Sequence, residues 1–309
     1  MNSIGGNRSS NSNSIAFIPV KGGLGNQMFF YAFSLLLNNN NKYTELLWNE
    51  YFFTKQHNGV EIFQAFHIKV DIRSKRKISF YLLLNRSRIP LIIKRLLSKI
   101  FGIKYQFYLK YLQATPYSYD EAVFIQKKKK ILYDGFWQNW KYLNKVENEI
   151  REKFVFNLPL GYENNIFLEK IIASNAVSIH IRRGDYLFDE FSELNVINSL
   201  NYYNNAIKYC KEHLNAPTFF IFSDDLPWAR QNFQDNDFVF VEGNKNKYAY
   251  LDMFLMSQCN HNIISNSTFS FWGAWLNEHS SKIVLAPNLW TKRVHSNTLC
   301  PPNWIFLEV

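Results

Sequence analysis

The second half of the chain alternates short apolar runs with amphipathic stretches. The apolar runs have the length and flanking polar residues of strands buried in a parallel sheet, and they lie at 176–181, 218–222, 237–241, 262–265 and 282–286. Helical periodicity marks the stretches at 202–214, 249–258 and 269–276. Strands that alternate with helices in this way predict an α/β fold with a doubly wound parallel sheet.

The first half begins with the same pattern. A strand is predicted over 15–20, a glycine turn over 21–26 and an apolar helix over 27–37. The middle of the chain, 71–126, is helix-rich in pattern and strongly basic. The repeated strand–turn–helix order predicts two Rossmann-like α/β lobes with a cleft between them.

The two expected lobes span 15–155 and 156–309, with the boundary placed within 150–172. Residues 1–14 are rich in Asn, Ser and Gly and are expected to form a disordered polar tail. The segment after 287 is expected to be a helix or tail that crosses back to the first lobe.

Composition narrows the class of protein. A chain of 309 residues with 47% hydrophobic and 19% charged residues is globular and long enough for two domains. The three cysteines fit neither a metal site nor a paired set, which favours a reducing compartment. The start of the chain lacks the pattern of a signal peptide, and the sequence lacks an apolar run of the roughly 20 residues that span a bilayer. A cytoplasmic location is therefore expected.

The net charge of +10 arises from one segment. Between Arg73 and Lys110 there are basic residues and no acidic ones; the basic residues are Arg73, Lys75, Arg76, Lys77, Arg86, Arg88, Lys94, Arg95, Lys99, Lys104 and Lys110. This pattern fits an amphipathic helix on an anionic membrane surface, at the inner face of the membrane, and equally a solvated basic face. The sequence has no zinc-finger or RNA-recognition signature, so nucleic acid is not an expected partner.

The strand over 176–181 ends in an unusual polar group. Alternation along a strand puts His180 and Arg182 on one face, where a buried parallel sheet should be apolar. Ligands of open α/β sheets bind at the carboxyl ends of the strands, and the arginine fork suits phosphate. Arg182 is thus a candidate phosphate clamp. Arg183 and Asp185 are also candidate residues of this ligand site. The alternative is that they form an ion pair that only holds the loop.

The next strand ends in Ser223, Asp224 and Asp225. An aspartate at this position can accept from ribose hydroxyls or from the N–H edge of guanine, and paired acids can also hold Mg²⁺. A third role is the N-cap of a helix that starts near Pro227. We favour Asp224 for the ligand and Asp225 for the cap.

Two further turns carry polar groups. Ser267, Thr268 and Ser270 open the helix over 269–276, and a helix N-terminus with several hydroxyls favours phosphate. In the first lobe the turn at 21–26 is an incomplete dinucleotide fingerprint, because Met28 stands where a third glycine belongs. We interpret it as a tight turn that brings residues to the cleft; the residues are Gly23, Gly25, Asn26 and Gln27.

Together these motifs resemble the α-1,2-fucosyltransferases of glycosyltransferase family 11. The resemblance lies in GGLGNQM at 22–28, HIRRGD at 180–185, FSDD at 222–225 and SNSTFSFWGAWL at 265–276, with support from HNGVE at 57–61 and DGFWQ at 134–138. It covers about 15–290 in the family's order, departing in the polar tail and in Val60, where Phe is common. Four motifs in order are far more specific than any one of them.

The resemblance implies an inverting, metal-independent enzyme of GT-B fold that transfers fucose from GDP-β-L-fucose to a galactoside, without any cofactor. The lobe over 15–155 would face the acceptor, a galactose-containing oligosaccharide or lipid-linked glycan, and the lobe over 156–309 would bind GDP-fucose. Arg182 would bind the β-phosphate, Asp224 the guanine or ribose, and Asn26 would lie near the fucose.

Two questions stay open at the level of sequence. A general base for the acceptor hydroxyl is expected among Asp185, Glu190 and Glu61, with Asp185 favoured, or the reaction proceeds without one. Fucose transfer in α-1,3 or α-1,6 linkage and a non-catalytic membrane-docking, carbohydrate-binding protein are the alternative functions.

Overall fold

The computed structural model describes residues 14–48, 59–69, 93, 96, 109–113, 117–126, 130–157, 159–184, 186, 188–189, 192–197 and 200–309. Residues 1–13 of the predicted polar tail and nearly all of the basic segment 73–110 lie outside these residues, as do Asp185 and Glu190. Ser14, the last residue of the predicted tail, belongs instead to a strand. In the part of the chain that is described, no helix has the length and apolar character needed to cross a membrane.

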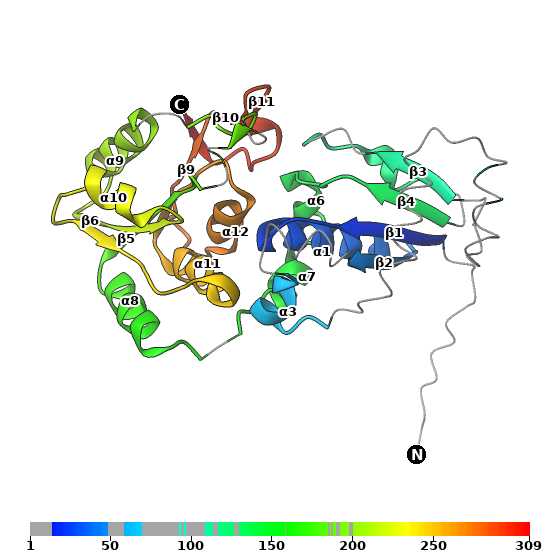
Figure 1. The fold of residues 1–309 in the computed structure, drawn as a ribbon, viewed down its shortest axis with the longest axis horizontal. Helices are drawn as coiled ribbons and strands as arrows, with labels where there is room; N and C mark the ends of the chain where they lie inside the picture. The colour runs from blue at the N-terminus through cyan, green and yellow to red at the C-terminus, as the bar shows by residue number, and fades with distance from the viewer. Residues whose placement is uncertain are drawn as a thin grey trace, which may run out of the picture.

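Two parallel sheets carry the fold (Figure 1). The first has the order β2 (Lys42–Trp48), β1 (Ser14–Val20), β4 (Lys130–Asp134), β3 (Leu109–Gln113). The second has the order β12 (Ile305–Leu307), β9 (Val284–Pro287), β8 (His261–Ile263), β5 (Asn175–Ile181), β6 (Pro217–Ser223), β7 (Phe238–Phe240). The predicted α/β class is confirmed.

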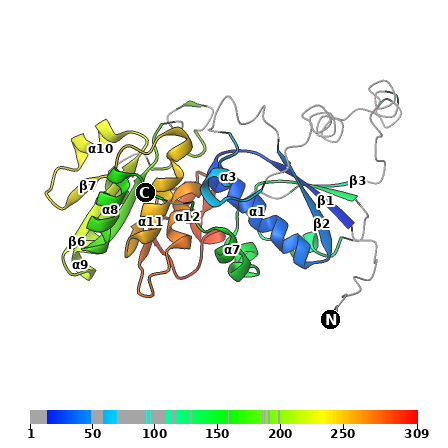
Figure 2. The same cartoon turned by 90° about the horizontal axis from the view of Figure 1, so that it is seen from below.

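Helices connect and cover the strands (Figures 1 and 2). In the first half they are α1 (Leu24–Asn39), α3 (Glu61–Phe66), α6 (Trp140–Asn144) and α7 (Glu147–Lys153). In the second half they are α8 (Tyr162–Ile172), α9 (Asn201–His213), α10 (Leu226–Asn232), α11 (Tyr250–Gln258) and α12 (Thr268–Leu276). Short 3₁₀ turns lie at Glu121–Val123, Asn246–Tyr248 and Ser296–Thr298.

The second sheet is covered on both faces by apolar side chains. One face of β5, with Val177, Ile179 and Ile181, packs in a cluster with residues of α9. The other face, with Ala176, belongs to a cluster that includes residues of α11 and α12. This is the alternation that the sequence predicted, and it places His180 on the α12 side of the sheet.

The part of the chain after Pro287 differs from the prediction. It forms an antiparallel pair, β10 (Leu289–Thr291) with β11 (Val294–His295), and then strand β12, which pairs with β9 in the second sheet. The segment does return to the first half, as predicted: the Leu299 carbonyl accepts from Trp140 N at 2.9 Å and the Thr298 carbonyl from Asn139 Nδ2 at 2.8 Å. The strand β3 also lies inside the middle segment that was predicted to be helix-rich.

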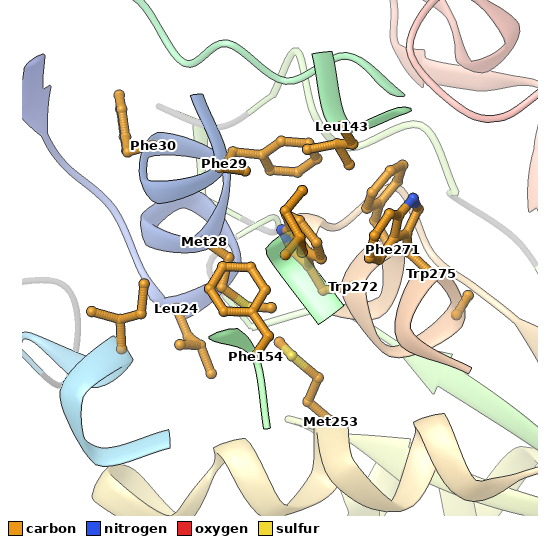
Figure 3. Close-up of a cluster of buried hydrophobic side chains, with 14 of the residues drawn as sticks. Leu24, Met28, Phe29, Phe30, Leu143, Phe154, Met253, Phe271, Trp272 and Trp275 are labelled. Carbon is orange, nitrogen blue, oxygen red and sulfur yellow. The ribbon is translucent and has the colours of Figure 1, made fainter. Parts of the chain in front are cut away.

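One apolar cluster joins the two halves of the molecule (Figure 3). Met28 and Phe29 of α1 pack with Phe154, with Met253 of α11 and with Trp272 of α12. The Phe29 and Phe154 rings lie 5.0 Å and 5.3 Å from the Trp272 ring. Burial of these large side chains stabilises the junction between the two sheets' helices in the same way as an ordinary domain core.

The tightest point of this junction is a glycine. Trp272 Nε1 donates to the Gly25 carbonyl at 2.9 Å, which draws the first turns of α1 and α12 together. A Cβ atom on Gly25 would lie 2.6 Å from the Thr268 carbonyl carbon, closer than any real contact. Only glycine fits at this position, because the neighbour is backbone and cannot rotate away.

We therefore expect Gly25→Ala to lower the free energy of unfolding by about 1–3 kcal/mol, the scale for overpacking a close contact. Gly161→Ala is the matched control, because nothing lies within 4 Å of a Cβ atom there. Urea unfolding of both variants measures the difference. Equal destabilisation by the two substitutions would show that the Gly25–Thr268 approach does not limit the packing.

Candidate active site

The carboxyl ends of β5 and β6 lie side by side, with Ile181 in register with Ser223. The residues that follow these strands, 182–184 and 224–225, therefore form one polar edge of the second sheet. It is the edge at which ligands of parallel α/β sheets bind.

His180 is the last buried polar residue of β5, with 7% of its surface exposed. Its Nδ1 atom lies 2.9 Å from the Ser265 hydroxyl, on the neighbouring segment after β8. Burial, with the Arg182 charge adding to it, lowers the pKa of His180 to about 3. The imidazole is therefore neutral near pH 7, and its contact with Ser265 holds the end of the strand to the segment after β8.

Asp224 holds the loop that follows β5. Its carboxylate accepts from the Arg183 and Gly184 amides at 2.9 Å and 3.1 Å and lies 3.1 Å from Arg182 Nη1. A Cβ atom on Gly184 would meet the same carboxylate at 2.8 Å. The sequence favoured Asp224 as a direct ligand contact, whereas the structure gives its oxygens to the loop and to Arg182.

Arg182 itself stays partly exposed, at 32% of its side chain, and its guanidinium lies 5.9 Å from the Tyr186 ring. The Tyr186 hydroxyl donates to the Asn266 carbonyl at 3.2 Å. Arg182 is thus placed between the loop that Asp224 holds and the segment that leads into α12. Tyr186 was not singled out from the sequence, since an aromatic residue after a strand has no distinctive pattern.

Arg183 points to a different partner from Arg182. Its Nε lies 3.2 Å from Asp225, and its guanidinium stacks 4.0 Å above the Trp228 ring. Asp225 also accepts from Trp228 N at 3.1 Å as the N-cap of α10, which confirms the predicted cap. Ser223 accepts from Asp225 N at 2.9 Å. The loop-holding partner of Arg183 is therefore Asp225.

The hydroxyls before α12 divide into two groups. Ser270 is fully buried, and its Oγ donates to the carbonyls of Ser265 and Ser267 at 3.3 Å and 3.2 Å. Ser267 is 7% exposed and caps Phe269 N at 3.3 Å. Of the three hydroxyls proposed for phosphate, only that of Thr268 lies at a partly exposed position. Ser267 and Ser270 instead shape the turn that presents the helix N-terminus.

The glycine turn of the first half shows a similar division. Gln27 is fully buried; its Nε2 donates to the carbonyls of Gly22 and Gly59, and its Oε1 accepts from Glu61 N at 2.9 Å. Glu61 is 7% exposed, and its carboxylate accepts from Leu24 N at 3.0 Å. These two side chains hold the turn to α3. Glu61, a candidate base by sequence, therefore accepts from the first N–H group of α1 in this structure.

Asn26 is the residue of this turn that faces the second half. Its Oδ1 accepts from Thr268 Oγ1 at 3.1 Å and from Gln138 Nε2 at 2.7 Å. Gly22 lies against its other end, since a Cβ atom there would meet Asn26 Nδ2 at 2.2 Å. Asn26 thus joins the turn after β1, the segment after β4 and the start of α12. The sequence indicated Asn26 and Thr268 separately but not their contact.

A second polar cluster, not foreseen from the sequence, lies at the start of α11. Asp252 accepts from Asn244 Nδ2 at 2.8 Å, and Asn244 and Asn164 exchange two amide hydrogen bonds at 2.9 Å and 2.7 Å. Burial raises the pKa of Asp252 to about 7, against the lowering effect of the Asn244 bond. A carboxylate within an otherwise apolar helix is the signal that could have revealed it, and strongly perturbed acids gather at functional sites.

Among the described residues, no group of three or more His, Cys, Asp or Glu side chains is arranged to hold a metal ion.

Comparisons with known proteins place this architecture. The fold resembles that of the fucosyltransferase NodZ from Bradyrhizobium, with a TM-score of 0.51 over 84% of this chain and 92% of that one, at 14% identity. A NodZ structure described as an α-1,6-fucosyltransferase soaked with GDP-fucose matches equally, with a TM-score of 0.51 over 85% of this chain. The two-sheet α/β fold is therefore one that sugar transferases use.

Sequence relatives are closer. The Escherichia coli O-antigen biosynthesis glycosyltransferase WbnK is 32% identical over 304 residues, covering 93% of this chain and 99% of that protein. An E. coli α-1,2-colitosyltransferase is 31% identical, covering 96% and 99%. Galactoside α-(1,2)-fucosyltransferase 1 of Leontocebus fuscicollis is 28% identical over 46% of this chain and 42% of its own length.

The sequence model of glycosyl transferase family 11 matches residues 15–308. The chain belongs to this family and is a glycosyltransferase, and the resemblance found in its motifs is confirmed.

The Asp252 cluster gives a pH dependence of stability. A carboxyl whose pKa rises from 3.8 to about 7 on folding binds its proton more tightly in the folded state, so stability falls as pH rises between those values. Asp252→Asn keeps the acceptor for Asn244 and removes the titration. We expect its Tm to exceed that of the wild type by a margin that grows from pH 4 to pH 7 and is then constant.

Thermal unfolding from pH 4 to 8 measures this margin, with Glu169→Gln on the exposed face of α8 as the control. A margin for Asp252→Asn that does not change with pH would mean that this carboxyl is not perturbed.

Proposed function

We propose that the enzyme transfers L-fucose from GDP-β-L-fucose to a galactoside hydroxyl with inversion, as a galactoside α-1,2-fucosyltransferase of surface-glycan synthesis. The family and the relatives named for α-1,2-fucosyl and α-1,2-colitosyl transfer support the reaction class and linkage. The O-antigen relative, matched along nearly its whole length, supports an O-antigen or capsule context. The acceptor is then an oligosaccharide or a lipid-linked glycan, and the enzyme works in the cytoplasm.

The observation that carries the proposal is the meeting of the two sheets' ligand-binding edges at Asn26 and Thr268. The N-terminus of α1 follows β1, the N-terminus of α12 follows β8, and the two side chains are 3.1 Å apart. Helix N-termini present N–H groups and partial positive charge, which favour phosphate. The first N–H of α1 already donates to Glu61, so we assign the phosphate to the first turn of α12. In this proposal the two lobes form a GT-B arrangement, with the donor diphosphate in a cleft beside this junction.

The negative charge that develops on the leaving GDP determines which residues are needed for catalysis. The acceptor oxygen attacks the anomeric carbon of fucose, the bond from that carbon to the β-phosphate oxygen breaks, and GDP leaves with the bonding electrons. We assign Arg182 and the first turn of α12 to the growing negative charge of GDP, without a metal ion. Asp224 positions Arg182 and the loop after β5 before substrate arrives, so little reorganisation remains for the transition state.

The proton of the acceptor hydroxyl needs a base. Asp185 remains our first candidate and Glu190 the second. The buried Glu61 carboxylate already accepts from Leu24 N, and the lowered pKa of His180 makes its imidazole a weak base. Asn26 lies where it can orient the sugar between the two lobes.

Arg182→Ala should lower kcat by about 10²–10³-fold, or about 3–4 kcal/mol, the scale for removing one donor to a developing oxyanion. Arg182→Lys should recover little, because it lacks the planar fork. Initial-rate kinetics at saturating substrates measure the loss. Arg230→Ala, an exposed arginine paired with Glu242, is the matched control and should turn over normally. Near-normal turnover of the Arg182 variants would remove Arg182 from this role.

The second candidate donor is GDP-colitose. The α-1,2-colitosyltransferase relative covers nearly the whole chain at an identity almost equal to that of WbnK. We extend the proposed GDP carrier to colitose, so that the assignments of Arg182 and the α12 turn are the same for both donors.

The deciding experiment incubates the protein with GDP-fucose or GDP-colitose and a panel of β-galactosides, with and without EDTA, and measures GDP release and product linkage. Transfer of fucose to the 2-hydroxyl, unchanged by EDTA, is the expected result. An α-1,3 or α-1,6 product would contradict the proposed α-1,2 linkage. Loss of activity in EDTA would indicate a metal ion at Asp224 and Asp225. A non-catalytic binding protein would release no GDP with any combination of donor and acceptor.

A further inference from the structure

The segment that follows β4, Gly135–Asn139, carries a feature that the donor site does not use. Phe136 is 40% exposed, whereas the two residues that follow it, Trp137 and Gln138, are 4% and 5% exposed. The hydrophobic effect favours covering a ring of this size, as it does for the Trp137 ring beside it. Its position at the carboxyl end of β4 puts it on the ligand-binding edge of the first sheet.

The backbone at the residue after Phe136 has a rare conformation. Trp137 has a φ of 55°, in the left-handed region that bulky residues seldom adopt. Its ring stacks on Phe33 with centroids 4.1 Å apart and planes 2° apart, and this buried contact offsets the strain. Strain of this kind persists where the surrounding structure determines it, and it gathers at functional sites. Here it buries residue 137 and leaves Phe136 at the surface.

The ammonium group of Lys21 lies over the Phe136 ring and is paired with Asp134. Lys21 Nζ lies 4.7 Å from the ring centroid and 3.2 Å from Asp134 Oδ1. The Phe30 ring supports it at 6.1 Å. An exposed aromatic ring with an ammonium group close to it matches a sugar, which has an apolar C–H face and hydroxyls around its rim.

The position of the Phe136 ring relative to the donor site indicates whether it would bind the acceptor sugar or the donor sugar. Two residues after Phe136, Gln138 bonds Asn26, and Asn26 in turn contacts Thr268 of the second lobe. Phe136 therefore lies on the first-lobe side of the junction, whereas Arg182 and the α12 turn lie on the second-lobe side. A sugar on Phe136 would be next to the transferred sugar without being part of the nucleotide.

We propose that Phe136 is the stacking platform for the acceptor sugar, with Lys21, held by the buried Asp134, binding its hydroxyls. This inference rests on the proposed function, since it names the acceptor subsite of the same reaction. Phe136 binds the apolar face of the acceptor ring and so sets its KM, while the Lys21–Asp134 pair fixes the orientation in which one hydroxyl faces the donor.

The test compares Phe136→Ala, Phe136→Leu and Phe136→Tyr, using the β-galactoside that supports transfer by the wild type. Phe136→Ala and Phe136→Leu should raise the acceptor KM about tenfold, because both lack a flat ring, and Phe136→Tyr should stay within about twofold. The KM for GDP-fucose and the rate of donor hydrolysis without acceptor should be unchanged in all three variants. The matched control is Tyr43→Ala, an aromatic residue of the same sheet that is 54% exposed near its amino edge.

The outcomes separate the two proposals. An unchanged acceptor KM in Phe136→Ala, or an equal rise in Tyr43→Ala, would overturn the platform while leaving the enzyme's function intact. A rise in donor KM or a loss of donor hydrolysis would place Phe136 at the donor instead and would also overturn it. Absence of transfer by the wild type with every acceptor would contradict the proposed function itself.

Discussion

The close approach of two helix N-termini is the constraint on which the rest of the structure depends. Gly25 lies against the Thr268 backbone, and Trp272 Nε1 bonds the Gly25 carbonyl. Each helix begins at the carboxyl edge of its own sheet, so this contact brings the two edges together. The apolar cluster around Phe29 and Trp272 then extends the contact into a shared core. The polar groups of both lobes meet because the backbones can approach this closely.

Most polar side chains near the junction of α1 and α12 form hydrogen bonds within the protein. Gln27, Glu61, Ser267 and Ser270 satisfy backbone groups of the turns. Buried donors and acceptors must be paired, so tight turns at a buried edge require such residues. The side chains at partly exposed positions include Asn26, Arg182 and Thr268, which are the ones accessible to a ligand. The division leaves a small number of accessible polar groups on a rigid support, which is what preorganised charge stabilisation needs.

Much of the fold followed from local patterns. The strands β5 and β6 and the helices α9, α11 and α12 were predicted within a few residues, because a buried parallel strand and an amphipathic helix each have a clear periodicity. Strands β2, β3 and β4 were not predicted. Lys42–Trp48 mixes charged and apolar residues at a sheet edge, and Leu109–Gln113 follows a basic stretch that had the composition of a helix. Their pairing depends on partners far away in the chain.

The sequence by itself determined the class of fold, the family, the faces of β5 and the cap at Asp225, since each follows from residues close together in the chain or from motif order. Only the tertiary structure decided which polar groups are committed to the protein. It assigned Asp224 to the loop after β5, Ser270 to the interior and Asn26 to its contact with Thr268. The physical reason is that the role of a polar side chain depends on its burial and on its hydrogen-bond partners. Those partners come from segments that neither spacing nor periodicity relates.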